Sequence, residues 1–181
     1  MARISKSPAI FDMEKLTYFN AEYIKAMDPP AFARAAEPWI RQAVKNPAYD
    51  PALIAALLQQ RTEKLTDIPE KLDFFDELPE YDTELYVHKK SKCDEAVALD
   101  MLQKMRPRLA ALPAWTEDAV RDCLVGAAEE FGCKNALVMW PVRIAAAGKA
   151  VTPGGAVEIC HILGREETLR RLDIGIEKLT K

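Results

Sequence analysis

The residues best suited to chemistry are one arginine and a glycine-containing turn, nine to twelve positions apart. Arg143 lies in residues 141–147, which predict a short helix because proline suits a first helical position. The turn at 148–155 that follows ends in Thr152, Pro153, Gly154 and Gly155. An arginine side chain and exposed backbone N–H groups can meet on one surface while the helices behind them pack. The pattern favours reading a ligand over transforming it.

The groupings that support catalysis or metal binding are absent from the sequence. Four cysteines and two histidines are scattered, and no two cysteines have the close spacing of a zinc site. No nucleophile stands beside a base, and there is neither a carboxylate pair nor a glycine-rich phosphate loop. We predict no catalytic residue, no bound metal and no cofactor in this chain. His161 is predicted to be a packing residue, and the four cysteines are predicted to be free, mostly buried thiols: Cys93, Cys123, Cys133 and Cys160.

Charge is distributed unevenly along the 181 residues. The net charge of −3 argues against a protein that grips nucleic acid by bulk charge alone. Residues 62–84 carry nine acidic and two basic side chains, whereas residues 133–181 carry eight basic and five acidic ones. If RNA binds, we expect the C-terminal third to face it. No apolar run is long enough to span a bilayer and residues 1–12 lack the core of a signal peptide, so a cytoplasmic protein is expected.

Helix start and stop signals follow one another along the whole chain and predict an all-α fold of two small helical bundles in series. The boundary is expected within the acidic connector 76–83, dividing the chain into 1–80 and 81–181. Only 85–88 could form a strand. Helices are predicted at 13–27, with Leu16, Phe19, Tyr23 and Ile24 on one face, and at 31–36, 38–44, 51–64, 66–75, 92–105 and 117–131, before the 141–147 helix, a helix ending at Gly164 and a last charged helix.

Two stretches resemble one known family. The corner PVRIAAAG at 141–148, followed by TPGG at 152–155 and LGREETLRRL at 163–172, is similar to the anticodon-binding end of bacterial glutamyl-tRNA synthetases. SKSPAIFDMEKLTYFNAEYI, at 5–24, resembles the stretch that lies downstream of the catalytic half in the same family. Two patterns in the family's order make the resemblance specific, and nothing here resembles the family's ATP-binding half.

The resemblance implies roles for several residues. Arg61 stands eight residues before the proline of the turn DIPEK, where family members that discriminate glutamate tRNA from glutamine tRNA carry an arginine that reads the third anticodon letter. From the residues alone, Arg61 is a surface arginine at a helix end, and Arg143 an ion-pair partner. The family pattern makes Arg143 a contact to the anticodon loop. The same pattern implies that the turn contacts RNA through Thr152, Pro153, Gly154 and Gly155. Lys149 is a candidate phosphate contact because of its charge and position.

Three features have a plainer alternative. Thr152 and Pro153 suit a helix start, although an open helix N-terminus also offers N–H groups to phosphate or bases. Gly155 stands where some members carry leucine, which puts an apolar base contact from that position in doubt. The three tryptophans are spaced like core anchors, but an exposed Trp140 could stack on an unpaired base. Residues 3–7 look like the KMSKS loop of class I synthetases, yet no nucleotide-binding sheet precedes them, and we interpret them as a decoy.

The resemblance therefore implies a tRNA anticodon recognition module of a bacterial glutamyl-tRNA synthetase without its catalytic domain. The parent would join L-glutamate to its tRNA with ATP and Mg²⁺, and this chain alone is predicted to be non-catalytic and monomeric. Its expected partners are the anticodon loop of glutamate tRNA and the catalytic half of the parent, with no membrane contact. The alternative is a free-standing helical adaptor that binds protein, because RNA binding does not explain the acidic stretch 62–84.

Overall fold

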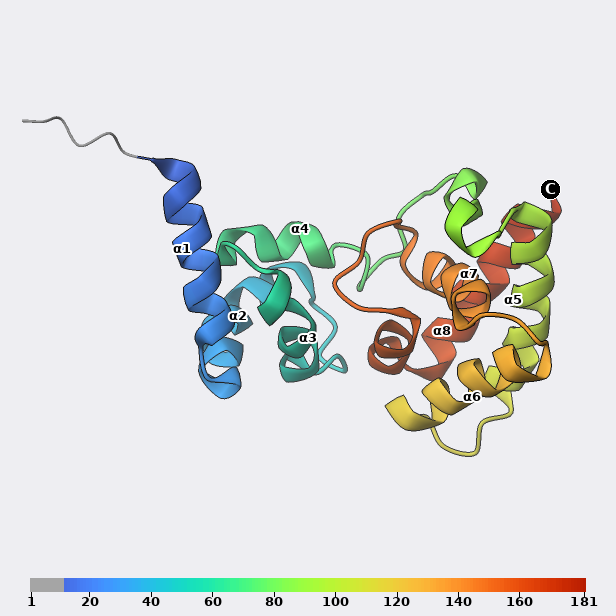
Figure 1. Cartoon of the computed structure of the whole chain (residues 1–181). Helices are drawn as coiled ribbons and strands as arrows, with labels where there is room; N and C mark the ends of the chain where they lie inside the picture. The colour runs from blue at the N-terminus through green and yellow to red at the C-terminus, as the bar shows by residue number, and fades with distance from the viewer. Residues whose placement is uncertain (1–11) are drawn as a thin grey trace, which may run out of the picture.

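The computed structural model describes residues 12–181, in which helices are joined by turns (Figure 1). The predicted all-α class is confirmed: around 85–88, where alone a strand could have formed, Thr83–Tyr86 is a 3₁₀ turn and His88 pairs with Cys93 in an isolated bridge. The similarity at 5–11 and the decoy at 3–7 lie outside the described residues. The helices are α1 (Met13–Ala26), α2 (Pro29–Ala43), α3 (Pro51–Leu58), α4 (Ile68–Leu72), α5 (Glu95–Ala110), α6 (Glu117–Glu130), α7 (Asn135–Ala147) and α8 (Ala156–Thr180).

Capping side chains explain most helix boundaries. Asp12, Asp50 and Thr116 each accept a hydrogen bond from a backbone N–H of the first turn of α1, α3 and α6, as their sequence positions predict. At α5 the cap is Asp94, which accepts from the N–H of Val97, so the helix begins three residues later than predicted. The glycines predicted to end helices adopt the left-handed conformation, with φ of 63° at Gly132, 64° at Gly148 and 79° at Gly164, where α8 kinks.

Three prolines lie inside helices, where we had predicted breaks. Pro38 is within α2, Pro107 within α5 and Pro141 within α7, so the predicted helix at 141–147 begins at Asn135 instead. A proline removes one helical hydrogen bond and crowds the preceding turn. Beyond each proline the helix continues to bury apolar side chains: Ile40 in α2, Leu109 in α5, and Val142 and Ile144 in α7 are all without solvent exposure. Burial outweighs the lost bond.

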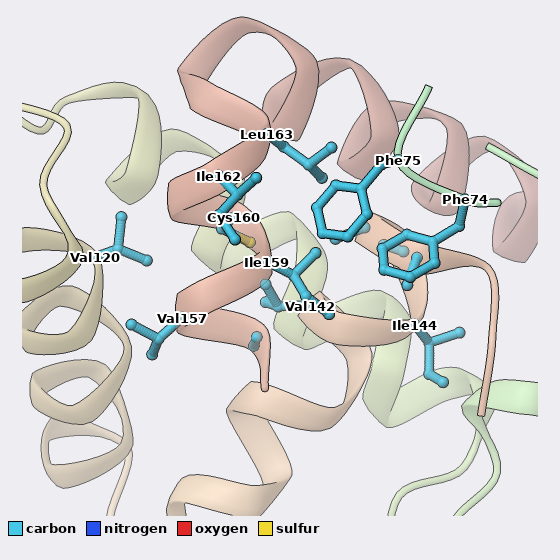
Figure 2. Packing of buried hydrophobic residues seen from close by; sticks show 14 of the residues in the cluster. Phe74, Phe75, Val120, Val142, Ile144, Val157, Ile159, Cys160, Ile162 and Leu163 are labelled. Carbon is cyan, nitrogen blue, oxygen red and sulfur yellow. The ribbon is translucent and has the colours of Figure 1, made fainter. Parts of the chain in front are cut away.

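The helices form two groups, with α1–α4 on one side of Figure 1 and α5–α8 on the other. Phe74 and Phe75, in the segment after α4, stack with ring centroids 4.4 Å apart, and both are fully buried. Figure 2 shows these rings beside Ile159 and Leu163 of α8. The end of the first group is therefore packed into the apolar core of the second.

Arg171 of α8 fixes this junction. Its guanidinium has no solvent exposure, and its Nη1 donates to the carbonyl oxygens of Phe74 at 2.7 Å and Ala146 at 2.6 Å. Nη2 donates to the carbonyl of Phe75 at 2.8 Å, and Nε to the carboxylate of Glu167 at 2.5 Å. Buried polar groups are stable only when hydrogen-bonded, and here one side chain satisfies three backbone acceptors.

The apolar face predicted for α1 is not where α1 packs. Ile24 is buried together with Ala21, but Leu16, Phe19 and Tyr23 are exposed by 44%, 55% and 72%. The periodicity is helical, as predicted, but only part of the apolar surface finds a partner within the described chain.

The thiols are free, as predicted, but only Cys93 and Cys160 are fully buried. Burial raises the pKa of Cys93 to about 11 and that of Cys160 to about 12. These two thiols therefore stay protonated and unreactive near neutral pH.

We predict that Arg171→Met lowers the free energy of unfolding by about 3–5 kcal/mol, because it leaves three buried carbonyls without donors. Urea unfolding followed by circular dichroism measures the loss. Arg170→Met is the matched control: Arg170 is exposed, pairs with the same Glu167 and should contribute less than about 1 kcal/mol. Similar losses in the two variants would contradict the role of Arg171.

Acid should weaken the same junction through Glu167. Burial raises the pKa of this carboxyl group, but hydrogen bonds from Arg170 and Arg171 prevail and lower it. A pKa lower in the folded than in the unfolded state adds stability that is present above the unfolded pKa and is lost as pH falls through the folded one. Wild type should therefore exceed Glu167→Gln in unfolding free energy above about pH 5, and the difference should shrink on acidification. A difference that does not change with pH would contradict this assignment.

Candidate nucleic-acid interface

Two arginines that are distant in sequence meet at Thr152. The Nη1 of Arg61 donates to the carbonyl oxygen of Thr152 at 2.9 Å, across 91 residues of chain. The Nη1 of Arg143 donates to the hydroxyl oxygen of the same threonine at 3.0 Å. Thr152 itself is buried. The structure thus brings together the arginine of each helix group that the sequence singled out, on one residue of the predicted turn.

The position of Arg61 is set by the turn that carries it. The predicted helix 51–64 stops early, and Arg61 lies in the 3₁₀ turn Gln59–Arg61. The side-chain amide of Gln59 donates to the carbonyls of Ile24 at 3.2 Å and Met27 at 2.8 Å. The hydroxyl of Thr62 donates to the carbonyl of Leu58 at 2.9 Å. These bonds on either side of Arg61 hold its backbone, and the hydrogen bond to Thr152 directs the side chain.

Arg143 and the turn at 148–155 hold one another. Nη2 of Arg143 donates to the carbonyl of Ala150 at 3.0 Å, and the hydroxyl of Thr152 donates to the carbonyl of Gly154 at 2.7 Å. A Cβ on Gly154 would lie 3.0 Å from Cδ1 of Leu57 in α3. A side chain at this position would require Leu57 to shift, because the turn approaches the first helix group closely.

Two guanidinium groups, those of Arg61 and Arg143, lie together at this site. Burial, and then the nearby Arg61 cation, lower the pKa of Arg143, yet an arginine remains charged near neutral pH. Within residues 12–181, no carboxylate forms an ion pair with either guanidinium. Arg143 therefore does not form the ion pair that the residues alone had suggested, as far as the described part of the chain shows. Two like charges held together favour an electron-rich ligand.

Arg61 stands between two hollows. One, of about 340 Å³, is also lined by Glu70, Lys71, Lys149 and Pro153. The other, of about 270 Å³, is lined by His88, Ser91, Trp140, Arg143 and Gly154 among others. Sequence reasoning did not single out His88 or Ser91 for this site. The Nδ1 of His88 lies 2.6 Å from the hydroxyl of Ser91, and no pattern in the sequence indicates that pair.

Trp140 is not an open stacking surface. His88 stacks on the indole with ring centroids 4.0 Å apart, and the Arg143 guanidinium carbon lies 4.6 Å from the ring centre. The indole N–H lies between the carbonyls of Leu85 at 3.2 Å and Tyr86 at 3.1 Å. Its observed contacts support Arg143, so it serves the site by positioning that side chain.

Lys149 and Gly155, which were both expected to contact RNA, have hydrogen-bond partners within the chain. The ammonium of Lys149 contacts both carboxylate oxygens of Asp73, one at 2.6 Å, in an exposed pair of the kind that contributes little stability. The N–H of Gly155 donates to the carboxylate of Glu158 at 2.9 Å. The N–H of the residue that precedes α8 is thus capped from within, because Glu158 lies in the first turn of the helix and reaches back.

Other site types find little support in the described part of the chain. No group of three or more His, Cys, Asp or Glu side chains there is placed to hold a metal ion. Among the same residues, no helix has both the length and the apolar character needed to cross a membrane.

Comparison with known proteins places this site in a family. The family model described as "Anticodon binding domain" matches residues 13–176. The chain belongs to this family. The match includes Arg61, Arg143 and the turn at 152–155, so the site lies within the part of the chain that defines the family.

Longer relatives contain the same domain. The "Glutamate--tRNA ligase" of Clostridium tetani is 46% identical over 176 residues, and that of Lachnoclostridium phytofermentans 48% identical over 177. These matches cover 97% and 98% of this chain but 36% of each relative, so the chain spans about a third of their length. The crystal structure of a glutamate tRNA ligase from Elizabethkingia meningosepticum has a TM-score of 0.77 at 24% identity, over 97% of this chain and 34% of that one. This likeness shows that the fold is shared.

The turn depends on Gly148, and we predict that Gly148→Ala destabilises the protein more than Gly132→Ala. Both glycines have a positive φ that costs alanine about 1 kcal/mol or more. A Cβ on Gly148 would also lie 2.9 Å from Cδ1 of Tyr81 and 3.0 Å from Cγ of Pro79, whereas one on Gly132 meets nothing within 4 Å. Urea unfolding of the two variants separates the steric effect from the backbone strain. Equal losses would show that the surroundings of Gly148 yield freely.

Proposed function

We propose that this chain recognises the anticodon loop of glutamate tRNA on behalf of a glutamyl-tRNA synthetase whose catalytic part lies outside these residues. The observation that carries the proposal is the convergence of Arg61 and Arg143 on Thr152 without a neutralising carboxylate. A guanidinium offers parallel donors to a base edge that carries acceptors and rejects one that carries a donor. Family membership and the ligase names of the relatives support this assignment.

The proposed roles follow the geometry. Arg61 reads a base, with only its Nη1 engaged by Thr152, and Arg143 orients the loop from the opposite helix group. Lys149 exchanges its exposed partner Asp73 for a phosphate, and the turn Thr152, Pro153, Gly154 and Gly155 supplies the surface on which the loop rests. The division at residue 80 gives each helix group one arginine of the pair, and it is proposed as the domain boundary. The complete enzyme would use ATP and Mg²⁺, while this chain acts without a cofactor, as a monomer in the cytoplasm.

The acidic stretch that motivates the adaptor alternative has internal partners. Asp76 accepts hydrogen bonds from the N–H groups of Lys45 and Asn46, and Asp82 caps a 3₁₀ turn. Glu80 pairs with Lys178 of α8 at 2.8 Å. These carboxylates have roles in the fold and in the junction between helix groups that do not require a second protein. This observation favours RNA recognition over the adaptor.

The test is binding of anticodon stem-loops of glutamate tRNA and glutamine tRNA at low salt. We predict that Arg61→Gln weakens binding of the glutamate stem-loop about tenfold or more, near 1–3 kcal/mol, and narrows the preference between the two RNAs. Arg143→Gln should weaken both. Arg34 is an exposed arginine of α2, and Arg34→Gln is the matched control. This variant should lose only the small part of the RNA affinity that one distant charge contributes.

Binding of the two stem-loops with equal affinity, unaltered by Arg61→Gln, would contradict the discriminating role. Arg61→Lys keeps the charge without the fork of donors, so it should retain salt-dependent affinity and lose the preference. Glutamate-dependent exchange of pyrophosphate into ATP by the purified chain would contradict the recognition-only assignment.

A further inference from the structure

The large apolar side chains exposed on this protein are concentrated on one helix. Eight large hydrophobic residues are exposed in the described chain, and five of them lie on α1: Met13, Leu16, Tyr18, Phe19 and Tyr23. Scattered single exposures are ordinary, but a cluster on one helix marks an interaction surface. Tyr18 and Phe19 also touch edge to face, with ring centroids 5.8 Å apart.

The exposed stripe is distinct from the surface by which α1 holds to its own chain. Leu16, Phe19 and Tyr23 follow one another at helical spacing and share a face, whereas Ala21 and Ile24 point into the protein. Among the described residues, the polar side-chain contacts from other segments reach the second half of α1. The amide of Asn20 donates to the carbonyl of Glu63, and the amide of Gln59 to the carbonyls of Ile24 and Met27.

Charge on α1 identifies the class of partner. The helix carries Glu14, Lys15, Glu22 and Lys25, equal numbers of acids and bases, with Lys25 paired to Glu22 at 2.8 Å. Nucleic acids and anionic membranes are bound by a surplus of basic side chains. A neutral helix with two adjacent aromatic rings and a tyrosine on the next turn has the composition of a protein–protein contact.

We propose that the face of α1 formed by Leu16, Phe19 and Tyr23 docks against the part of the longer glutamate–tRNA ligase chain that these 181 residues do not match. The occupant follows from length: the chain covers 36% of its relatives, so the larger part of each relative lies outside the segment described. This inference rests on the proposed function, since it assigns the face to the catalytic portion of the same enzyme. Docking through the face would fix the distance between the anticodon site and that portion.

The test compares the isolated chain with a chimera in which this chain replaces the matching 36% of the Clostridium tetani ligase. Phe19→Cys and Tyr23→Cys introduce a thiol on the face, and Leu53→Cys introduces one on α3, where Leu53 is 39% exposed. The rate of reaction with N-ethylmaleimide is followed at each site by peptide mass mapping. We expect the two α1 thiols to react at least tenfold more slowly in the chimera than in the isolated chain, with no change at Leu53→Cys.

Equal rates at the α1 thiols in the two proteins would overturn the proposal, and so would the same slowing at Leu53→Cys. Slowing that appears in the isolated chain on raising its concentration would assign the face to a second copy and would also overturn it. The anticodon stem-loop titration separates the two ideas, because Phe19→Cys should leave RNA binding unchanged. If the α1 thiols react more slowly in the chimera while Arg61→Gln does not change the affinity for the stem-loop, the docking proposal is supported and the recognition role is refuted.

Discussion

The buried guanidinium of Arg171 is the interaction on which the arrangement of the two helix groups depends. It donates to carbonyls of Phe74 and Phe75 at the end of the first group and of Ala146 in the second, while Glu167 balances its charge. A cation without solvent contact is tolerated only when its donors are satisfied, so the three carbonyls must stay where they are. The residue at the end of α7 and the connector after α4 are thereby held at hydrogen-bonding distance from one another. The proposed recognition site lies on the same connection.

The Arg61–Thr152–Arg143 cluster shows how the chain holds two like charges together before any ligand arrives. Each guanidinium donates to an oxygen of Thr152, and burial of Arg143 limits how far it can move away. The repulsion between the arginines is offset by packing and hydrogen bonds elsewhere, those of Arg171 among them. Such preorganisation removes part of the entropic penalty that a flexible pair of arginines would meet on binding RNA.

Local signals in the sequence predict much of the fold, and distant contacts account for what they miss. Caps such as Thr116 and helix-closing glycines such as Gly164 act within one turn of chain, so their positions could be predicted. Pro141 was misassigned because its penalty is local while its compensation, the burial of Val142 against other helices, is not. Arg61 and Arg143 could be named as candidates from the resemblance, but their meeting at Thr152 spans 91 residues and needed the structure. The capping of α8 by Glu158 and the His88–Ser91 pair depend on side-chain directions that no periodicity encodes.

The separation between Arg171 and its acceptors has a consequence for synthesis on the ribosome. Phe74 precedes Arg171 by 97 residues, which at roughly 5–20 residues per second is a delay of about 5–20 s. During that interval the stacked rings of Phe74 and Phe75 exist without α8 to cover them, and newly made apolar surface of this kind is what chaperones bind. Asp73 and Asp76 flank the two rings, and charges beside an apolar segment oppose aggregation of the nascent chain. An acidic connector thus suits an apolar segment whose covering helix is made last.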